Sequence, residues 1–319
     1  MIISPEVLTI LILNGLIVIF ASISLIFAIK IALYWNINAT SQFQYKLEKS
    51  SYLVSTVIKY IFFLKIPLFL FFIWTLDKTS NLITGAMCAV GVINSVDIGI
   101  YLMVLKILNI YLFGIWLTIH SIDLKYEDLK YTKLKFQIYI FLYILLILEA
   151  ILIAKMFIEI DIDKIVSCCG TIFTSNSSKT LGLLLNIDSK IIISIFIINY
   201  IALLYFYIKR IKYIFGILNI LFLITSIVSL ISFFSTYIYE LPTHHCPFCL
   251  LQKDYYYIGY ILYTLLFLGT LYGTLTLIKE FLKERADRDY KNSIIFNTLY
   301  FIIVISYPIL YLIKNGTTL

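Results

Sequence analysis

Long runs of apolar residues recur along the whole chain and are separated by short polar stretches. Each run is about 20 residues long or longer, which is the length that an α-helix needs to cross the hydrocarbon layer of a bilayer. The stretches between the runs are too short for a soluble domain of useful size. The pattern therefore predicts an all-α, polytopic transmembrane bundle with eight spans, at residues 8–34, 51–76, 97–120, 136–157, 190–208, 214–238, 254–278 and 293–313.

Composition agrees with this pattern. The 319 residues are 61% hydrophobic and 13% charged, whereas a soluble domain is about half apolar and a quarter charged. The formal net charge is +7, but the basic residues are scattered over short loops, so the charge does not indicate a nucleic-acid partner. We expect membrane lipid to surround the chain.

Lysine and arginine predict the orientation. They gather in the loops after the first, third, fifth and seventh spans, which the positive-inside rule places in the cytoplasm. The first span is preceded by Glu6 and by no basic residue, so we expect it to be an uncleaved helix with the N-terminus outside. The basic loop residues are Lys46, Lys49, Lys125, Lys130, Lys133, Lys135, Lys209, Arg210, Lys212, Lys279, Lys283, Arg285, Arg288 and Lys291.

The same orientation places all five cysteines on the outer side. Cys88 lies in the loop after the second span, Cys168 and Cys169 in the loop after the fourth, and Cys246 and Cys249 in the loop after the sixth. The orientation follows from lysine and arginine alone, so the placement of all five cysteines on one side is an independent observation. The outer side of a bacterial inner membrane is oxidising. We therefore expect a multi-pass inner-membrane protein whose cysteine loops face outward and are exposed to thiol–disulfide chemistry.

The stretch HHCPFC, residues 244–249, is the main candidate for chemistry. We predict that the Cys-x-x-Cys begins a helix, with Pro247 at the first helical position, so that both sulfurs lie on one face. The positive end of the helix dipole and the adjacent His244 or His245 would then stabilise a thiolate at Cys246. Cys249 would lie one turn deeper, where it meets a reactant dissolved in the membrane. The structural alternative is two unrelated buried cysteines.

The other cysteines are open to several interpretations. The α-carbons of adjacent residues lie about 3.8 Å apart, which is below the usual range for a disulfide, so a bond between Cys168 and Cys169 would be strained. We expect one of them to pair with Cys246 in some state, or both to bind a soft metal, with simple packing as the alternative. Cys88 is a third ligand, a resolving thiol or a core residue.

The same stretch also allows a metal site. His244, His245, Cys246 and Cys249, together with Cys88, offer nitrogen and sulfur ligands that suit copper or zinc. Covalent haem attachment is excluded, because a histidine would have to follow the second cysteine, and Leu250 stands there.

Four lysines fall inside the predicted spans or near their ends. We expect Lys155 to extend its charge to the membrane surface, whereas Lys59, Lys65 and Lys106 are candidates for a functional role, because a charge inside the bilayer is costly. The run Tyr255–Tyr257 is typical of an interfacial anchor, with the wall of a quinone pocket as the alternative.

Two of the cysteine segments resemble a known family. The segment SCCGTIFTS, residues 167–175, looks like the outer-loop cysteine, apolar pair and serine of the vitamin K epoxide reductase-like family. Two spans later, CPFC opens a span as the redox motif of that family does. The resemblance covers roughly residues 136–280 and extends to bacterial membrane disulfide-forming enzymes in general. One departure is that residues 159–162 hold no cysteine, where the family has a second one upstream.

The resemblance implies a role for each cysteine. Cys168 would be a shuttle cysteine, Cys246 its exchange partner and Cys249 the thiol that faces a quinone. The resemblance also implies a membrane quinone as cofactor and an extracytoplasmic thioredoxin-like protein as partner. The candidate catalytic residues are therefore Cys246, Cys249, Cys168 and Cys169.

We accordingly expect three regions: a three-span region of unknown role at 1–135, a four-span thiol-redox-like unit at 136–280, and a charged cytoplasmic loop with the last span at 281–319. The leading function is a thiol–disulfide oxidoreductase that exchanges electrons between the thioredoxin-like partner and the quinone. The alternative is a non-enzymatic protein that binds or transports a soft metal, most plausibly copper. A third hypothesis is a membrane subunit that anchors another complex and whose cysteines form structural disulfides.

Overall fold

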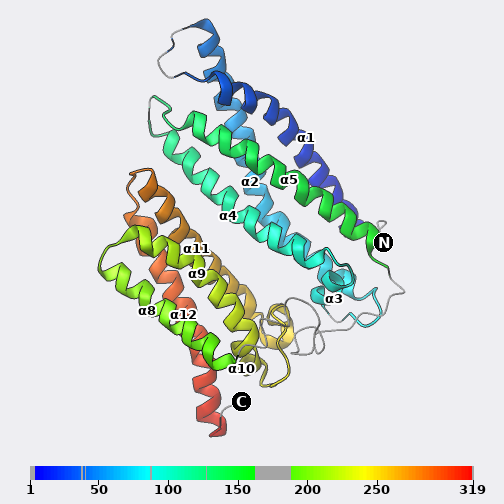
Figure 1. Cartoon of the computed structure of the whole chain (residues 1–319). Helices are drawn as coiled ribbons and strands as arrows, with labels where there is room; N and C mark the ends of the chain where they lie inside the picture. The colour runs from blue at the N-terminus through cyan, green and yellow to red at the C-terminus, as the bar shows by residue number, and fades with distance from the viewer. Residues whose placement is uncertain are drawn as a thin grey trace. The chain divides into compact units, whose positions relative to one another are not determined.

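The computed structural model describes residues 4–36, 39, 41–86, 88–126, 128–161 and 188–317. Over these residues the chain is helical and has no strand, and eight of its helical segments are long and apolar enough to cross a membrane. The predicted fold class is confirmed: the protein is an all-α, polytopic membrane bundle (Figure 1). The chain forms two compact units, Met1–Val166 and Ser167–Leu319, which we call unit 1 and unit 2.

Unit 1 contains four spanning helices and one short helix. The helix α1 packs against α2 and α5, α4 packs against α2 and α5, and the short α3 lies on α2 and α4 (Figure 1). Their bounds are α1 Pro5–Tyr34, α2 Gln42–Ser80, α3 Ala89–Asn94, α4 Gly99–Asp123 and α5 Thr132–Glu159.

Aromatic packing and the buried carboxylate of Asp123 help to hold the helices of unit 1 together. The rings of Phe62 and Phe113 stack with their centroids 4.2 Å apart, so that α2 and α4 are joined. The buried Asp123, at the end of α4, accepts hydrogen bonds from the backbone N–H of Tyr131 at 2.7 Å and from Lys135 Nζ at 2.6 Å. These contacts close the turn into α5 without leaving a buried charge unpaired.

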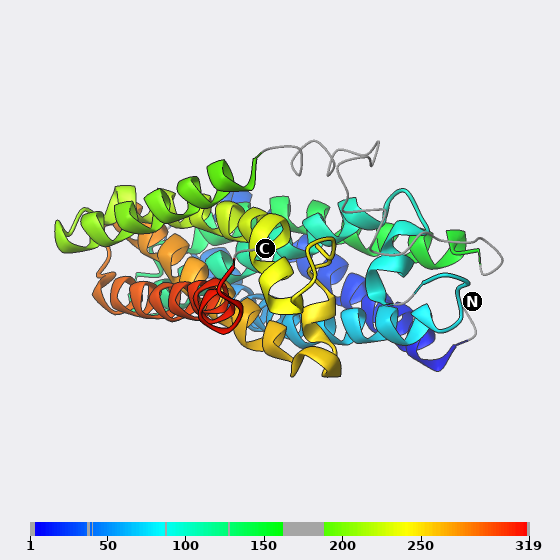
Figure 2. The same cartoon turned by 90° about the horizontal axis from the view of Figure 1, so that it is seen from below.

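Unit 2 is a second bundle of four spans. The helix α9 continues through a π-helical turn, η1, into α10, and together they form one span. The helix α11 packs against α9 and α12, and α8 packs against α9 and α12. The segment between α10 and α11, drawn in yellow, lies at the end of this bundle where α10 ends (Figures 1 and 2). The bounds are α8 Ser189–Ile208, α9 Lys212–Ser229, η1 Leu230–Phe234, α10 Ser235–Tyr239, η2 Cys249–Leu251, η3 Lys253–Tyr255, α11 Ile258–Phe281 and α12 Asp287–Asn315.

A buried polar network joins α9, α11 and α12. Asn219 Oδ1 accepts from Asn297 Nδ2 at 2.7 Å and from Ser293 Oγ at 3.0 Å. Asn219 fits because α11 has no side chain at Gly273: a Cβ at that position would lie 2.0 Å from Asn219 Cγ. Small residues and interhelical hydrogen bonds are the usual means of helix association in a bilayer, where apolar burial supplies little driving force between helices.

The outer faces of the spans are apolar. Ile12, Phe63 and Ile144 in unit 1, and Ile198 and Ile224 in unit 2, each expose more than half of their surface. In water such faces would be costly, but in a bilayer they meet lipid chains. The protein is therefore a multi-pass membrane protein.

The structure corrects the predicted ends of several spans. The helix α2 begins at Gln42, nine residues before the predicted span, so Lys46 and Lys49 lie on a helix and not in a loop. Lys133 and Lys135 likewise lie in the first turn of α5, and Lys212 opens α9. These basic residues remain near the predicted ends of their helices.

The division into units also differs from the predicted regions. The fourth long helix, α5, belongs to unit 1 and packs against α1, whereas the sequence interpretation grouped it with residues 136–280. The last span, α12, packs against α11 within unit 2 and is not a separate region.

We expect Gly273→Ala to destabilise the protein. The added methyl group would overlap Asn219, and overpacking of this kind costs about 1–3 kcal/mol, more than the ~1 kcal/mol that alanine gains over glycine in a helix. Thermal unfolding in detergent measures the effect. The matched control is Gly15→Ala, because a Cβ at Gly15 has no neighbour within 4 Å. Equal or higher stability of Gly273→Ala would contradict the close packing described here.

Candidate functional site

The CPFC sequence does not begin a long helix, and this part of the sequence interpretation was wrong. Pro247 and Phe248 lie in a bend, and Cys249 opens the three-residue 3₁₀-helix η2. A second short turn, η3, follows, and α11 starts at Ile258. Two consecutive residues in the left-handed region, Tyr256 and Tyr257, separate η3 from α11. The dipole of a long helix therefore does not act on Cys246. We call residues 240–257 the CPFC segment.

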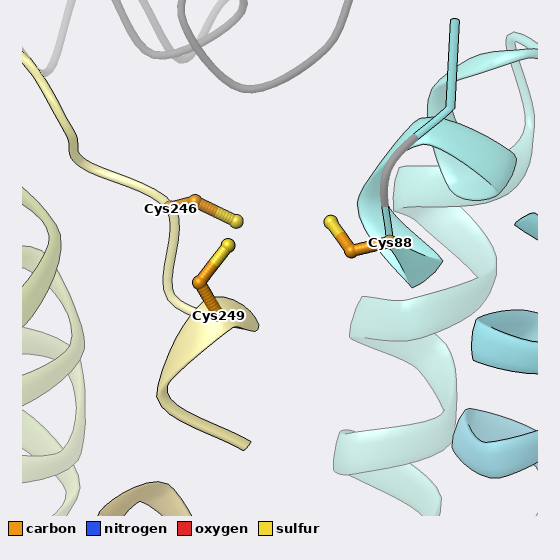
Figure 3. A group of neighbouring side chains, drawn as sticks. All are labelled: Cys88, Cys246 and Cys249. Atoms are coloured by element: carbon orange, nitrogen blue, oxygen red, sulfur yellow. The ribbon is translucent and has the colours of Figure 1, made fainter. Parts of the chain in front are cut away.

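The two sulfurs of this motif nevertheless lie side by side. Cys246 Sγ and Cys249 Sγ are within 4.8 Å of each other, and Figure 3 shows their side chains leaving one short stretch of chain with the sulfur atoms adjacent. Both cysteines are buried. The bend and the 3₁₀ turn thus bring the sulfurs together as the predicted helix turn would have done.

Two tyrosines hold the backbone of the motif. Tyr239, the last residue of α10, donates its hydroxyl hydrogen bond to the carbonyl oxygen of Cys246, and Tyr263 in α11 donates to that of Pro247. The motif also packs tightly on α11: a Cβ at Gly259 would lie 2.9 Å from the backbone of Leu250. The CPFC segment is therefore attached to the two spans that flank it.

The two histidines occupy different environments. The ring of His244 meets that of Tyr239 edge to face, with centroids 4.5 Å apart. His245 Nδ1 lies 3.0 Å from the carbonyl oxygen of Ile231, which belongs to the π-helical turn η1. The same carbonyl oxygen also accepts a hydrogen bond from Ser235 Oγ at 3.0 Å. The second ring nitrogen of His245 is then the one that remains for a ligand or a proton.

The tyrosines after the motif differ in their exposure. Tyr256 is 92% exposed, which suits an interfacial anchor. Tyr255 contacts the ring of Tyr239 with centroids 4.4 Å apart. Partial burial, together with the neighbouring Cys249, Asp254 and Cys246, raises the pKa of Tyr255 above its ordinary value, and its protonated hydroxyl can donate a hydrogen bond.

The remaining three cysteines are not part of the CPFC segment. Cys88, also labelled in Figure 3, precedes α3 in unit 1 as its N-cap residue and is buried. Cys168 and Cys169 lie outside the described residues, so their predicted pairing with Cys246 stays a prediction.

The lysines in the spans separate into two kinds. Lys155 is about half exposed and pairs with Glu159 at 3.5 Å, one turn away at the end of α5. Lys59 is also exposed. Lys65 and Lys106 are buried and both contact Glu149, a residue that the sequence interpretation missed. A carboxylate within an apolar run, as at Glu149, is the signal that would have found it.

Comparisons with protein-family models, with curated proteins and with solved structures find no match to this chain. The fold and the site therefore define a class, a polytopic helical membrane protein with a close cysteine pair in unit 2. The resemblance to the vitamin K epoxide reductase-like family stays a prediction.

We expect Tyr239→Phe to loosen the CPFC segment. Loss of the hydroxyl leaves the buried carbonyl of Cys246 without this donor, which costs about 1–3 kcal/mol, so the segment should open at least about fivefold more often. The rate at which a maleimide modifies Cys246 and Cys249 in the reduced, purified protein reports this opening, with mass spectrometry to locate the adduct. The control is Tyr256→Phe, in the same segment but exposed. Equal rates in both variants would show that Tyr239 does not secure the motif.

Proposed function

We propose that the protein is an integral membrane thiol–disulfide oxidoreductase whose redox centre is the pair Cys246 and Cys249. The observation that carries the proposal is the distance between their sulfurs, below 4.8 Å, on one short turn. A disulfide requires an S–S distance of about 2.05 Å, and small side-chain rotations can bring the two sulfurs that close. The tyrosine hydrogen bonds to the backbone keep the two residues in this arrangement in both redox states.

The exchange runs through a mixed disulfide. A thiolate of the partner protein attacks Cys246 in the Cys246–Cys249 disulfide, the S–S bond breaks, and Cys249 leaves as a thiolate. A second partner thiolate then attacks the mixed disulfide, so the partner is oxidised and Cys246 and Cys249 are reduced. The reverse steps transfer electrons in the other direction. Because both cysteines are buried, the CPFC segment has to open to admit a protein thiol.

The electrons need a second carrier. On the sequence resemblance, we propose that the dithiol passes two electrons and two protons to a membrane quinone, which gives a quinol and restores the disulfide. The partner in the exchange would be an extracytoplasmic thioredoxin-like protein, and Cys168 would relay electrons between it and Cys246. The distribution of basic residues supports a place in the inner membrane, with the CPFC segment on the outer face.

Soft-metal binding is the second candidate. The observation that favours it is the pair of adjacent sulfurs, which His244 or His245 would have to supplement with a nitrogen ligand. Copper and zinc both accept such sulfur and nitrogen ligands. A metal site needs all of its ligands at once, whereas a redox site needs the two cysteines and is only adjusted by the histidines.

We expect Cys249→Ala to trap mixed disulfides between Cys246 and the partner protein, because the thiol that resolves them is lost. The double variant His244→Ala/His245→Ala should form none of these trapped adducts and should retain most of the exchange activity. Adducts are detected by non-reducing gels and mass spectrometry after acid trapping, and bound metal by elemental analysis. Co-purifying copper or zinc that is lost in both variants, without adducts in Cys249→Ala, would refute the oxidoreductase and favour the metal site.

The orientation has a test of its own. In a background where all five cysteines are serine, Tyr256→Cys places one exposed thiol in the CPFC segment, and Arg285→Cys places one between α11 and α12. We expect a membrane-impermeant maleimide to label Tyr256→Cys in cells stripped of the outer barrier, and to label Arg285→Cys after lysis. The reverse pattern would place the CPFC segment in the cytoplasm and would remove the oxidising environment that the proposal needs.

A further inference from the structure

Unit 1 contains a buried cluster of charges that the proposed redox centre does not use. Glu149 Oε1 accepts from Lys65 Nζ at 3.1 Å and from Lys106 Nζ at 3.0 Å, and Glu149 Oε2 accepts from Asn109 Nδ2 at 2.6 Å. Lys65 Nζ also donates to Asn14 Oδ1 at 3.0 Å. One side chain each comes from α1, α2 and α5 and two from α4, and all five are at most 4% exposed.

The cluster lies deep within the span of the helices. At 1.5 Å per residue, Asn14, Lys106 and Glu149 lie roughly 10–15 Å from the nearer ends of α1, α4 and α5, respectively. The hydrocarbon layer is about 30 Å thick. Ionisable side chains at such a depth are costly, and they commonly mark ion pathways or proton relays.

The charges of the cluster do not balance. Glu149 is the carboxylate partner of both lysines, so two ammonium groups face one carboxylate and one positive charge is left over. Among the described residues, the charged groups that act on Lys106 are Glu149 on α5 and Lys65 on α2. The other adjoining helices add no charge, because α1 contributes the neutral Asn14 and α3 has no ionisable side chain.

The space beside the lysines is too small for a counter-ion. The cavity there has a volume of about 10 Å³, and Lys65, Lys106 and Glu149 line it together with apolar side chains. Such a volume holds one water at most, so an anion does not fit in it. Protonation of Glu149 would raise the excess charge to two. The change within the cluster that brings its charge to zero is therefore the loss of one proton from a lysine.

We propose that the cluster is a proton-exchange site, at which Lys106 gives one proton to a water that the cavity admits and takes it back. One N–H bond of the ammonium breaks, its electron pair stays on nitrogen, and the proton joins the water as hydronium before it reaches the aqueous phase. The Lys106 amine, the Lys65 ammonium and the Glu149 carboxylate then sum to zero charge.

The hydrogen bonds favour Lys106 over Lys65 as the group that exchanges. Lys65 has two oxygen acceptors, Glu149 and Asn14, which stabilise its charge. Among the described residues, Lys106 has Glu149 as its one oxygen acceptor, and its other contact is the ring of Phe72, 4.2 Å from Nζ. A neutral amine still has two N–H groups and a lone pair, so Lys106 can keep its hydrogen bond to Glu149 after the proton has left.

Nitrogen-15 NMR of the lysine side chains tests the proposal. The full-length protein, labelled at lysine Nζ, is reconstituted in phosphatidylcholine nanodiscs and titrated from about pH 6 to about pH 9, where exposed lysines stay charged. We expect one lysine resonance to move reversibly between the ammonium and the amine positions. It should be absent in Lys106→Met, which should fold because Lys65 and Glu149 remain as a balanced pair. The control Lys155→Met, at an exposed lysine of α5, should keep the titrating resonance.

Counting protons gives a second measurement. Titration with dilute base over the same pH range should release about one proton per chain more from the unsubstituted protein than from Lys106→Met, and Lys155→Met should release as many as the unsubstituted protein. The unsubstituted protein decides whether an exchange exists, and the variants assign it. Lysine resonances that all stay at the ammonium position would overturn the proposal, as would equal proton release from Lys106→Met or a titrating resonance that persists in that variant.

Discussion

The absence of water from the hydrocarbon layer is the constraint on which this structure depends. A polar group within that layer must find its partner inside the protein. Unit 1 meets this requirement with Glu149, which ties side chains of α2, α4 and α5 to one point. Unit 2 meets it with Asn219, which accepts from two side chains of α12. In each bundle a buried acceptor thus joins neighbouring helices, while the outer faces contact lipid.

The same constraint explains how the cysteine motif is held. The CPFC segment is irregular, so its carbonyl groups lack the partners that a long helix would give them. Tyr239 and Tyr263 supply those partners from the adjacent spans, and the ring of each tyrosine can lie in an apolar layer while its hydroxyl is satisfied. The position of the sulfurs is therefore set by the spans as much as by the spacing of the cysteines.

The spans could be predicted because their signal is simple: length and apolarity decide membrane insertion, and both can be read from one sequence. The start of α2 at Gln42 could not, because its first turns are polar and extend beyond the apolar run. The prediction that a long helix starts at Cys246 was wrong because Tyr256 and Tyr257 adopt left-handed conformations, which interrupt the chain before α11. Tyrosine has no preference for this region, so the sequence does not indicate it. Lys65 and Lys106 were identified as unusual from their places in apolar runs, but Glu149 was needed to show that they act together.

The π-helical turn η1 has a consequence for how this span can change. A π turn arises from one residue in excess of the α-helical count, and each residue of an α-helix turns the chain by about 100°. Deleting one residue between Leu230 and Phe234 would restore a regular helix and rotate everything beyond it, Tyr239 included, by about that angle. The tyrosine would leave the carbonyl of Cys246, and His245 would lose the carbonyl of Ile231. Insertion or deletion of a single residue is thus far less tolerable here than in a surface loop. The number of residues from η1 to the cysteines should therefore vary little among homologous proteins that keep the cysteine pair.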